Sequence, residues 1–174
     1  TTDVNVILPA AEYYARKGTA TEKMRAYYYL GIVYSNAGDD SRAQSCFILA
    51  DDEIPETSDY YTAGLIKAML ADIFSREYNS SQEQKYIEDA LYYSKQANDT
   101  IGEWYYSGRL AGCYYNNNQK AESDSLYEVF LAKPILDTSI YVNELLLYAK
   151  SLIYRRSPDY QKSIALFTKA LTFP

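Results

Sequence analysis

Acidic side chains crowd one short stretch of the sequence, and they are the first candidates for acid–base or metal chemistry. They are Asp51, Asp52, Glu53, Glu56 and Asp59. Catalytic carboxylates need a pocket that moves their pKa values apart. A Ca²⁺ loop needs the EF-hand spacing with its glycine and terminal glutamate, which this stretch lacks. We therefore predict a solvated acidic loop at a helix end rather than a catalytic or metal-binding site.

The residues that most often carry catalysis are missing or far apart. The chain has no histidine, which removes the commonest general base, the usual partner of a serine nucleophile and a common zinc ligand. Its two cysteines, Cys46 and Cys113, are too distant in sequence for a CxxC motif, and we expect both to be buried apolar residues. There is no glycine-rich phosphate loop. We predict that the chain is not an enzyme and holds no metal or cofactor.

Charge and hydropathy exclude two further classes of function. The net charge is -6 and the pI is about 4.7, which argues against binding of nucleic acid by this region. No apolar run approaches the roughly 20 residues of a transmembrane helix. The partner we expect is therefore a protein or a peptide.

Tyrosine is the most unusual feature of the composition, with 21 residues against 5 Phe and 1 Trp. Many occur as neighbours: Tyr13-Tyr14, Tyr27-Tyr28-Tyr29, Tyr60-Tyr61, Tyr92-Tyr93, Tyr105-Tyr106 and Tyr114-Tyr115. Adjacent helical residues point about 100° apart, so one ring of a pair can enter the core while the other faces solvent. The rings either pack between helices with wet hydroxyls or line a groove that stacks on a ligand.

The elements that must position these residues follow from an internal repeat. Residues 27–55 carry a spaced set of signature positions: Tyr27, Leu30, Gly31, Tyr34, Ala43, Phe47 and Pro55. Gly31 lies on the same helical face as Leu30 and Tyr34, where a missing side chain lets a second helix approach closely. This spacing resembles the tetratricopeptide (TPR) repeat.

Weaker copies follow downstream. One contains Leu110, Ala111, Tyr114 and Tyr127, and the last contains Tyr154, Phe167 and Ala170. The matching tyrosines lie 80 and 120 residues after Tyr34 instead of at multiples of 34. We attribute the residues beyond the standard repeat length to the segment 60–100. One extra helical turn on each of its two helices would accommodate them.

We therefore predict an all-α fold, a superhelix of antiparallel helix hairpins with about nine helices. The predicted helices are 6–17, 21–37, 40–53, 59–78, 81–98, 101–116, 119–132, 137–156 and 159–172. Pro9 should open the first, and a capping box of Thr19 with Glu22 should precede the second. The whole chain, 1–174, forms one array: a half repeat (1–18), a repeat (21–55), an elongated repeat (59–98) and two further repeats (101–134 and 137–174). We expect it to be a region of a longer protein.

The resemblance implies a concave groove lined by the first helix of each hairpin. The groove positions are Arg25, Tyr28, Ile32, Ser35, Asn36, Asp72, Ser75, Arg76, Tyr105, Gly112, Tyr115, Asn116, Tyr148, Leu152, Arg155 and Arg156. The four arginines among them would form a positive strip on an acidic protein, which suits an extended peptide bearing carboxylates.

The resulting functional hypothesis is a non-catalytic scaffold that binds a peptide or a partner domain. The segment 11–43 is similar to repeats of bacterial envelope-linked TPR proteins, which implies a regulatory role and a periplasmic or membrane-anchored location rather than a cytoplasmic one. Two alternatives stay open: a carbohydrate-binding surface protein with embedded TPR hairpins, and a dimerisation module that forms a homodimer.

Overall fold

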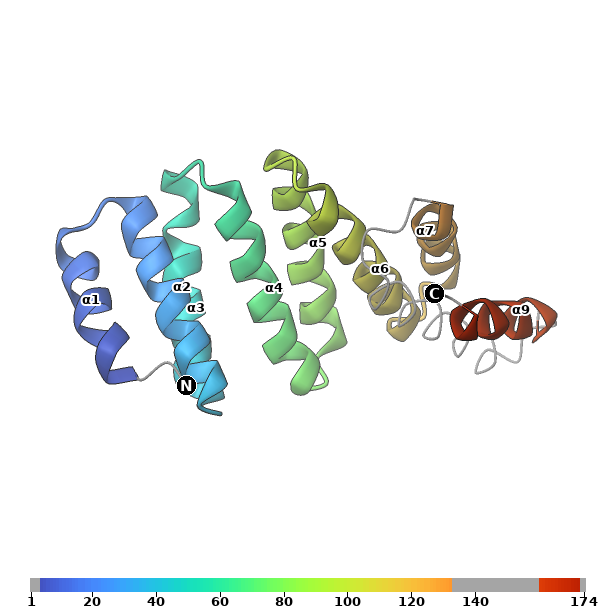
Figure 1. The fold of residues 1–174 in the computed structure, drawn as a ribbon, viewed down its shortest axis with the longest axis horizontal. Coiled ribbons are helices and arrows are strands. Elements are labelled where there is room, and N and C mark those ends of the chain that lie inside the picture. Colours follow the sequence, from blue (N-terminus) through green and yellow to red (C-terminus); the bar gives the residue numbers. More distant parts are fainter. Residues whose placement is uncertain (1–3, 133–159, 173–174) are drawn as a thin grey trace. The chain divides into compact units, whose positions relative to one another are not determined.

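The computed structural model describes residues 4–132 and 160–172, and within them the chain is all-helical. These residues form eight α-helices and one short 3-10 helix, with no strand (Figure 1). The α-helices are α1 (Val4–Lys17), α2 (Ala20–Asn36), α3 (Asp40–Asp52), α4 (Tyr60–Arg76), α5 (Ser80–Gln96), α6 (Thr100–Asn116), α7 (Lys120–Ala132) and α9 (Tyr160–Leu171). Consecutive helices from α1 to α5, and α6 with α7, pack on one another as antiparallel neighbours, which confirms the predicted all-α fold class. The predicted helix 137–156 lies outside the described residues.

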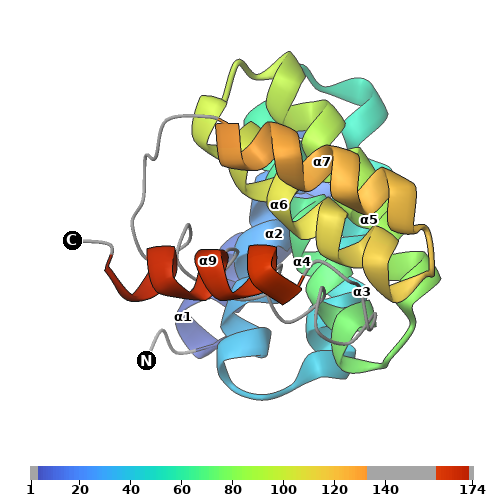
Figure 2. The same cartoon turned by 90° about the vertical axis from the view of Figure 1, so that its right-hand side faces the viewer.

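The chain divides into two compact units, residues 1–99 and 100–174. In the first, α1 to α5 lie side by side in chain order (Figure 1). In the second, α7 runs along α6 (Figure 2).

The hairpins repeat with one uniform period. Helices α2, α4 and α6 begin at residues 20, 60 and 100, so successive hairpins start 40 residues apart. Helix α4 has 17 residues, the same as α2, whereas α5 has 17 against 13 in α3. The predicted extra turn is therefore right for α5 and wrong for α4. The first hairpin has a shorter second helix, and the connection that contains the 3-10 helix Ile54–Glu56 makes up the difference in length.

The turns that end these helices share one geometry. Gly38, Tyr78, Asn98 and Asn118 all have positive φ, between 54° and 77°. The next N–H donates to a carbonyl five residues back, as from Asp39 to Tyr34 at 2.9 Å, which satisfies the free carbonyls of the helix end. Glycine and asparagine tolerate this left-handed conformation best. Gly38 lies between the predicted helices 21–37 and 40–53, and Asn118 lies between 101–116 and 119–132.

Helix starts are set by side-chain caps. Thr19 and Glu22 form the predicted capping box at the start of α2. Asp39 caps α3 by accepting the Arg42 N–H at 3.1 Å, and Asn79 caps α5. Each cap satisfies a backbone N–H that the first helical turn leaves unpaired.

Pro9 does not open a helix, contrary to the prediction. Helix α1 begins at Val4 and Pro9 lies in its interior, where it cannot donate to the Asn5 carbonyl. The helix continues through it because Ile7, Leu8 and Ala11 pack on one core cluster with α2 and α3. Burial of that face offsets the lost hydrogen bond.

The core of the first unit centres on Phe47, which is buried against α2. Its ring lies where a side chain at Gly31 would stand: an added Cβ would be 2.5 Å from Phe47 Cε1. The same cluster includes Met24 of α2 and both Ile66 and Leu70 of α4, so three helices share it. The repeat signature therefore marks the position where the Phe47 ring takes the space of a missing side chain on α2.

In the second unit the single tryptophan is part of the core. Trp104 of α6 is buried and stacks on Phe130 of α7, with ring centroids 4.5 Å apart. Lys162 of α9 forms an ion pair with Glu128 of α7. Cys46 and Cys113 are both free and buried, as predicted.

We expect Gly31→Ala to destabilise the protein by about 1–3 kcal/mol, because the new methyl group overlaps the ring of Phe47. Gly64→Ala is the matched control: its Cβ would stand 3.5 Å or more from its neighbours, and alanine favours a helix by up to about 1 kcal/mol. Thermal denaturation of both variants tests this. Equal melting temperatures would show that the Gly31 contact has been misplaced.

Candidate binding surface

Arg25, the first predicted groove residue, is held in an ion pair. Its Nε donates to Asp59 Oδ2 at 2.7 Å, which joins α2 to the start of α4. Asp59 also caps α4, since it accepts the Thr62 N–H at 3.2 Å and the Thr62 hydroxyl at 2.8 Å. Partial burial raises the pKa of Asp59, but the bonds from Thr62 and Arg25 outweigh it and lower this pKa overall.

Arg76 is held in the same way at the other end of the first unit. Its Nη2 lies 2.8 Å from Asp40 Oδ1, which joins the end of α4 to the start of α3. Helices α2 and α4 run parallel because each is antiparallel to α3. Arg25 near the start of α2 and Arg76 at the end of α4 therefore stand at opposite ends of the unit. These two arginines do not form an uncompensated positive strip.

The remaining groove candidates of α2 and α4 differ in exposure. Tyr28 and Ile32 are half-buried and pack against the Phe47 cluster. Ser35 is half-buried and Asn36 exposed at the end of α2. Asp72 is half-buried on α4. Tyr28 is thus part of the core as well as of the surface. Its partial burial raises its pKa, and the nearby Tyr29 and Tyr61 raise this pKa further.

In the second unit, Tyr105, Tyr115 and Asn116 all lie on α6. Tyr105 is half-buried and contacts Tyr106, with ring centroids 5.3 Å apart. Tyr115 is half-buried and Asn116 is exposed. Tyr148, Leu152, Arg155 and Arg156 lie outside the described residues.

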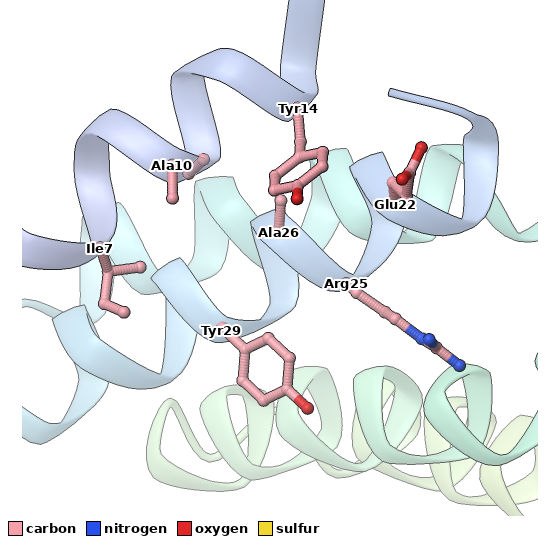
Figure 3. Close-up of a pocket in the computed structure, with 8 residues that line it drawn as sticks. Ile7, Ala10, Tyr14, Glu22, Arg25, Ala26 and Tyr29 are labelled. Carbon is pink, nitrogen blue, oxygen red and sulfur yellow. The ribbon is translucent and has the colours of Figure 1, made fainter. Parts of the chain in front are cut away.

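A pocket of about 310 Å³ lies between α1 and α2. Its walls are mainly apolar, with two tyrosine rings at the rim and two charged residues at one end (Figure 3). The lining residues are Ile7, Ala10, Ala11, Tyr14, Glu22, Arg25, Ala26 and Tyr29. It therefore offers a neutral, aromatic-edged recess next to the Arg25–Asp59 pair.

Of these lining residues the groove prediction contained only Arg25. Tyr29 was missed, although it is 57% exposed and faces the pocket, whereas its neighbour Tyr28 turns toward Phe47. The signal was the run Tyr27-Tyr28-Tyr29, but only the packed helices decide which ring stays at the surface. Tyr14 was part of a noted doublet, yet its contribution depends on the placement of α1 beside α2.

A second polar site, also missed, surrounds Lys67 of α4. Its side chain is only 13% exposed. Its Nζ donates to Asp51 Oδ2 of α3 at 3.0 Å, with Oδ1 at 2.8 Å, and lies 3.4 Å from Asp89 of α5. It also sits over the Tyr86 ring, 5.5 Å from the centroid. One cation thereby joins three helices.

The charges around Lys67 shift its titration and that of its neighbours. Burial lowers the pKa of Lys67, but Asp51 and Asp89 more than offset this and raise it overall. Burial raises the pKa values of Tyr86 and Tyr93; Lys67 lowers both, whereas Asp51 and Asp89 raise them, and the overall shift is upward. All these shifts keep the lysine charged and the tyrosines neutral near pH 7. The cluster is suited to holding helices together and not to proton transfer.

These contacts correct the prediction of a solvated acidic loop. Asp51 and Asp59 are half-buried and each faces a cation, whereas Asp52 and Glu56 are exposed. The physical reason is the packing of α4 against its neighbours, which brings Lys67 to Asp51 of α3 and places Asp59, at the start of α4, beside Arg25 of α2.

Residues 4–132 and 160–172 hold no group of three or more Asp, Glu or Cys side chains that could bind a metal ion. No helix in those ranges has the length and hydrophobicity needed to cross a membrane.

Comparison of the chain with protein-family models, curated proteins and solved structures finds no match.

We expect the Asp59 contribution to stability to depend on pH. Because its pKa is lower in the folded state, the contribution is full above the unfolded value near 4 and is lost as the pH falls through the folded value. Asp59→Asn keeps an oxygen for capping, so it should cost about 1 kcal/mol at pH 7 and less in acid. Chemical denaturation of both proteins from pH 7 to 3 measures this. A constant difference would contradict the assignment, and Arg25→Gln should reduce the pH dependence.

Removing the cation between α3, α4 and α5 should destabilise the first unit. Lys67→Met leaves Asp51 half-buried without its partner and should cost about 2–3 kcal/mol, slightly below the value for a fully buried pair. Exposed Lys85 on α5 provides the control, and Lys85→Met should change stability by less than about 0.5 kcal/mol. Adding Asp51→Leu to Lys67→Met should recover part of the loss. Urea denaturation compares the three, and equal effects of the two lysine changes would refute the role of Lys67.

Proposed function

We propose that this chain is a non-catalytic protein-interaction scaffold of the tetratricopeptide-repeat type. The observation that carries the proposal is the tyrosine-edged pocket between α1 and α2, on a stack of hairpins whose cores are already filled. Tyr14, Tyr29 and Tyr61 are all exposed, although large aromatic rings are normally buried. Exposed tyrosines beside an apolar recess are typical of protein-binding sites.

The pocket favours an apolar or aromatic side chain of a partner, carried on an extended segment or on a turn. Its volume is at the lower end of the range for ligand pockets, about 300 Å³, so one large side chain fills it. Tyrosine hydroxyls at the rim can bond the partner backbone.

The partner need not be acidic. Arg25 and Arg76 each face a carboxylate of this chain, so a peptide carboxylate would have to compete with Asp59 or Asp40. An acidic ligand along Arg155 and Arg156 stays a prediction. We propose a largely neutral ligand for the α1–α2 pocket.

Carbohydrate binding receives less support. Tryptophan is the side chain best suited to stacking on a sugar ring, and Trp104 is buried against Phe130 instead of exposed. A regulatory role next to a bacterial membrane rests on the sequence resemblance alone and belongs to the same proposal.

A peptide-display library selected against the purified chain tests the scaffold function. Peptides with a large apolar or aromatic residue should be enriched, and Tyr29→Ala should weaken their binding at least tenfold with little change in melting temperature. Isothermal titration calorimetry measures the affinities.

Tyr92→Ala is the matched control for this test. Tyr92 is 56% exposed against 57% for Tyr29, and each ring lies 5.2 Å from the tyrosine next to it in sequence. Tyr92 is not part of the pocket, so its removal should leave peptide affinity unchanged. If both variants bind equally well, or if only neutral sugars bind, the proposed site is wrong.

A further inference from the structure

Tyr78 is the most exposed large hydrophobic residue among the described residues. It lies in the turn between α4 and α5, and 95% of its surface is accessible. Within the described part of the chain its side chain makes no hydrogen bond, ion pair or ring contact. A tyrosine in this position adds nothing to the packing of its own fold.

The backbone of Tyr78 makes the choice of residue more unusual. Its φ is 56°, in the left-handed region. The three other turns of the same geometry place Gly38, Asn98 and Asn118 there, which are residues that tolerate this conformation. A bulky side chain in the left-handed region is strained, and such strain persists where function requires the residue.

The α1–α2 pocket has the size and chemistry to receive a tyrosine. Alanine residues form its floor, while Tyr14 and Tyr29 can meet an incoming ring edge to face. Arg25 has five N–H donors, of which Nε bonds Asp59, so its Nη groups can donate to a phenol oxygen.

Charges near the two features are complementary. Exposed Glu77 precedes Tyr78 in the turn. Exposed Lys17 ends α1, within one turn of Tyr14 at the pocket rim, and Arg16 beside it lies 3.8 Å from Glu12 of the same helix. A turn carrying Glu77 and Tyr78 therefore brings a carboxylate toward Lys17 when its ring enters the pocket.

The two features cannot meet within one copy of the chain. The pocket lies along the first half of α2, whereas Tyr78 follows the end of α4, and these two helices run parallel. We infer that Tyr78 of one copy occupies the α1–α2 pocket of a second copy in a head-to-tail contact. This rests on the proposed function, since it names the partner of the same pocket. Because such a contact uses two different surfaces, each copy added leaves one of each surface free.

The first test separates strain from packing. Tyr78→Asn should raise the melting temperature by about 2–4 °C at low protein concentration, because asparagine accepts the left-handed turn. Tyr92→Asn, in the interior of α5, should lower it, because asparagine is a weaker helix former. If Tyr78→Asn also lowers the melting temperature, Tyr78 stabilises its own fold and the inference is overturned.

The second test measures self-association by analytical ultracentrifugation from micromolar to near-millimolar concentration. The wild-type chain should form dimers and larger species as concentration rises. Tyr78→Asn should remain monomeric, and so should Ala10→Phe, which fills the pocket from an exposed position of α1. Circular dichroism and melting curves verify that both variants fold.

Mixing the two variants gives the decisive result. Tyr78→Asn retains an open pocket and Ala10→Phe retains Tyr78, so an equimolar mixture should form dimers and nothing larger. Wild-type protein that stays monomeric, or a mixture that stays monomeric, overturns the inference. If display-selected peptides still bind the pocket in a Tyr29-dependent manner under those conditions, the proposed function stands and only the choice of partner fails.

Discussion

The packing of the Phe47 ring of α3 against Gly31 of α2 is the contact on which the first unit depends. An amphipathic helix cannot bury its apolar face alone, so each helix of the first unit needs a closely packed neighbour. Phe47 fills the space that a side chain at Gly31 would take, and it packs in one cluster with residues of α4. The position of α4 therefore depends on the same ring, and with it the positions of Asp59, Lys67 and Arg76.

Polar contacts then fix the helices that this core brings together. Lys67 ties α4 to α3 and α5 through Asp51 and Asp89, while Arg25 and Arg76 bridge α4 to its neighbours at opposite ends. Exposed ion pairs contribute little stability, but a half-buried cation with two carboxylates constrains register, because a shifted helix would leave a charge without a partner. The paired charges of this unit thus act mainly within the fold. Several tyrosines remain exposed beside them.

Surface tyrosines are the residues on which the proposed recognition depends. Tyr14 and Tyr29 edge an apolar pocket, whereas Tyr78 projects from a turn in a strained conformation. Tyrosine has a large contact area, few rotatable bonds and a hydroxyl that stays solvated. It is therefore tolerated when exposed to solvent, and it contributes favourably to binding when a partner covers it. A recess and a projection of matching chemistry on one chain are what head-to-tail association requires.

The sequence by itself determined the fold class, most helix bounds, the cap at Thr19 and the special position of Gly31. These features depend on local spacing, which a single chain segment contains in full. Tertiary structure decided which of Tyr28 and Tyr29 faces solvent and that Arg25 and Arg76 are paired. It also decided that Asp51 is half-buried beside Lys67 and that α1 runs through Pro9. Each of these depends on which side chain a neighbouring helix brings within reach, and residues 16 to 36 positions apart in sequence do not reveal that distance in space.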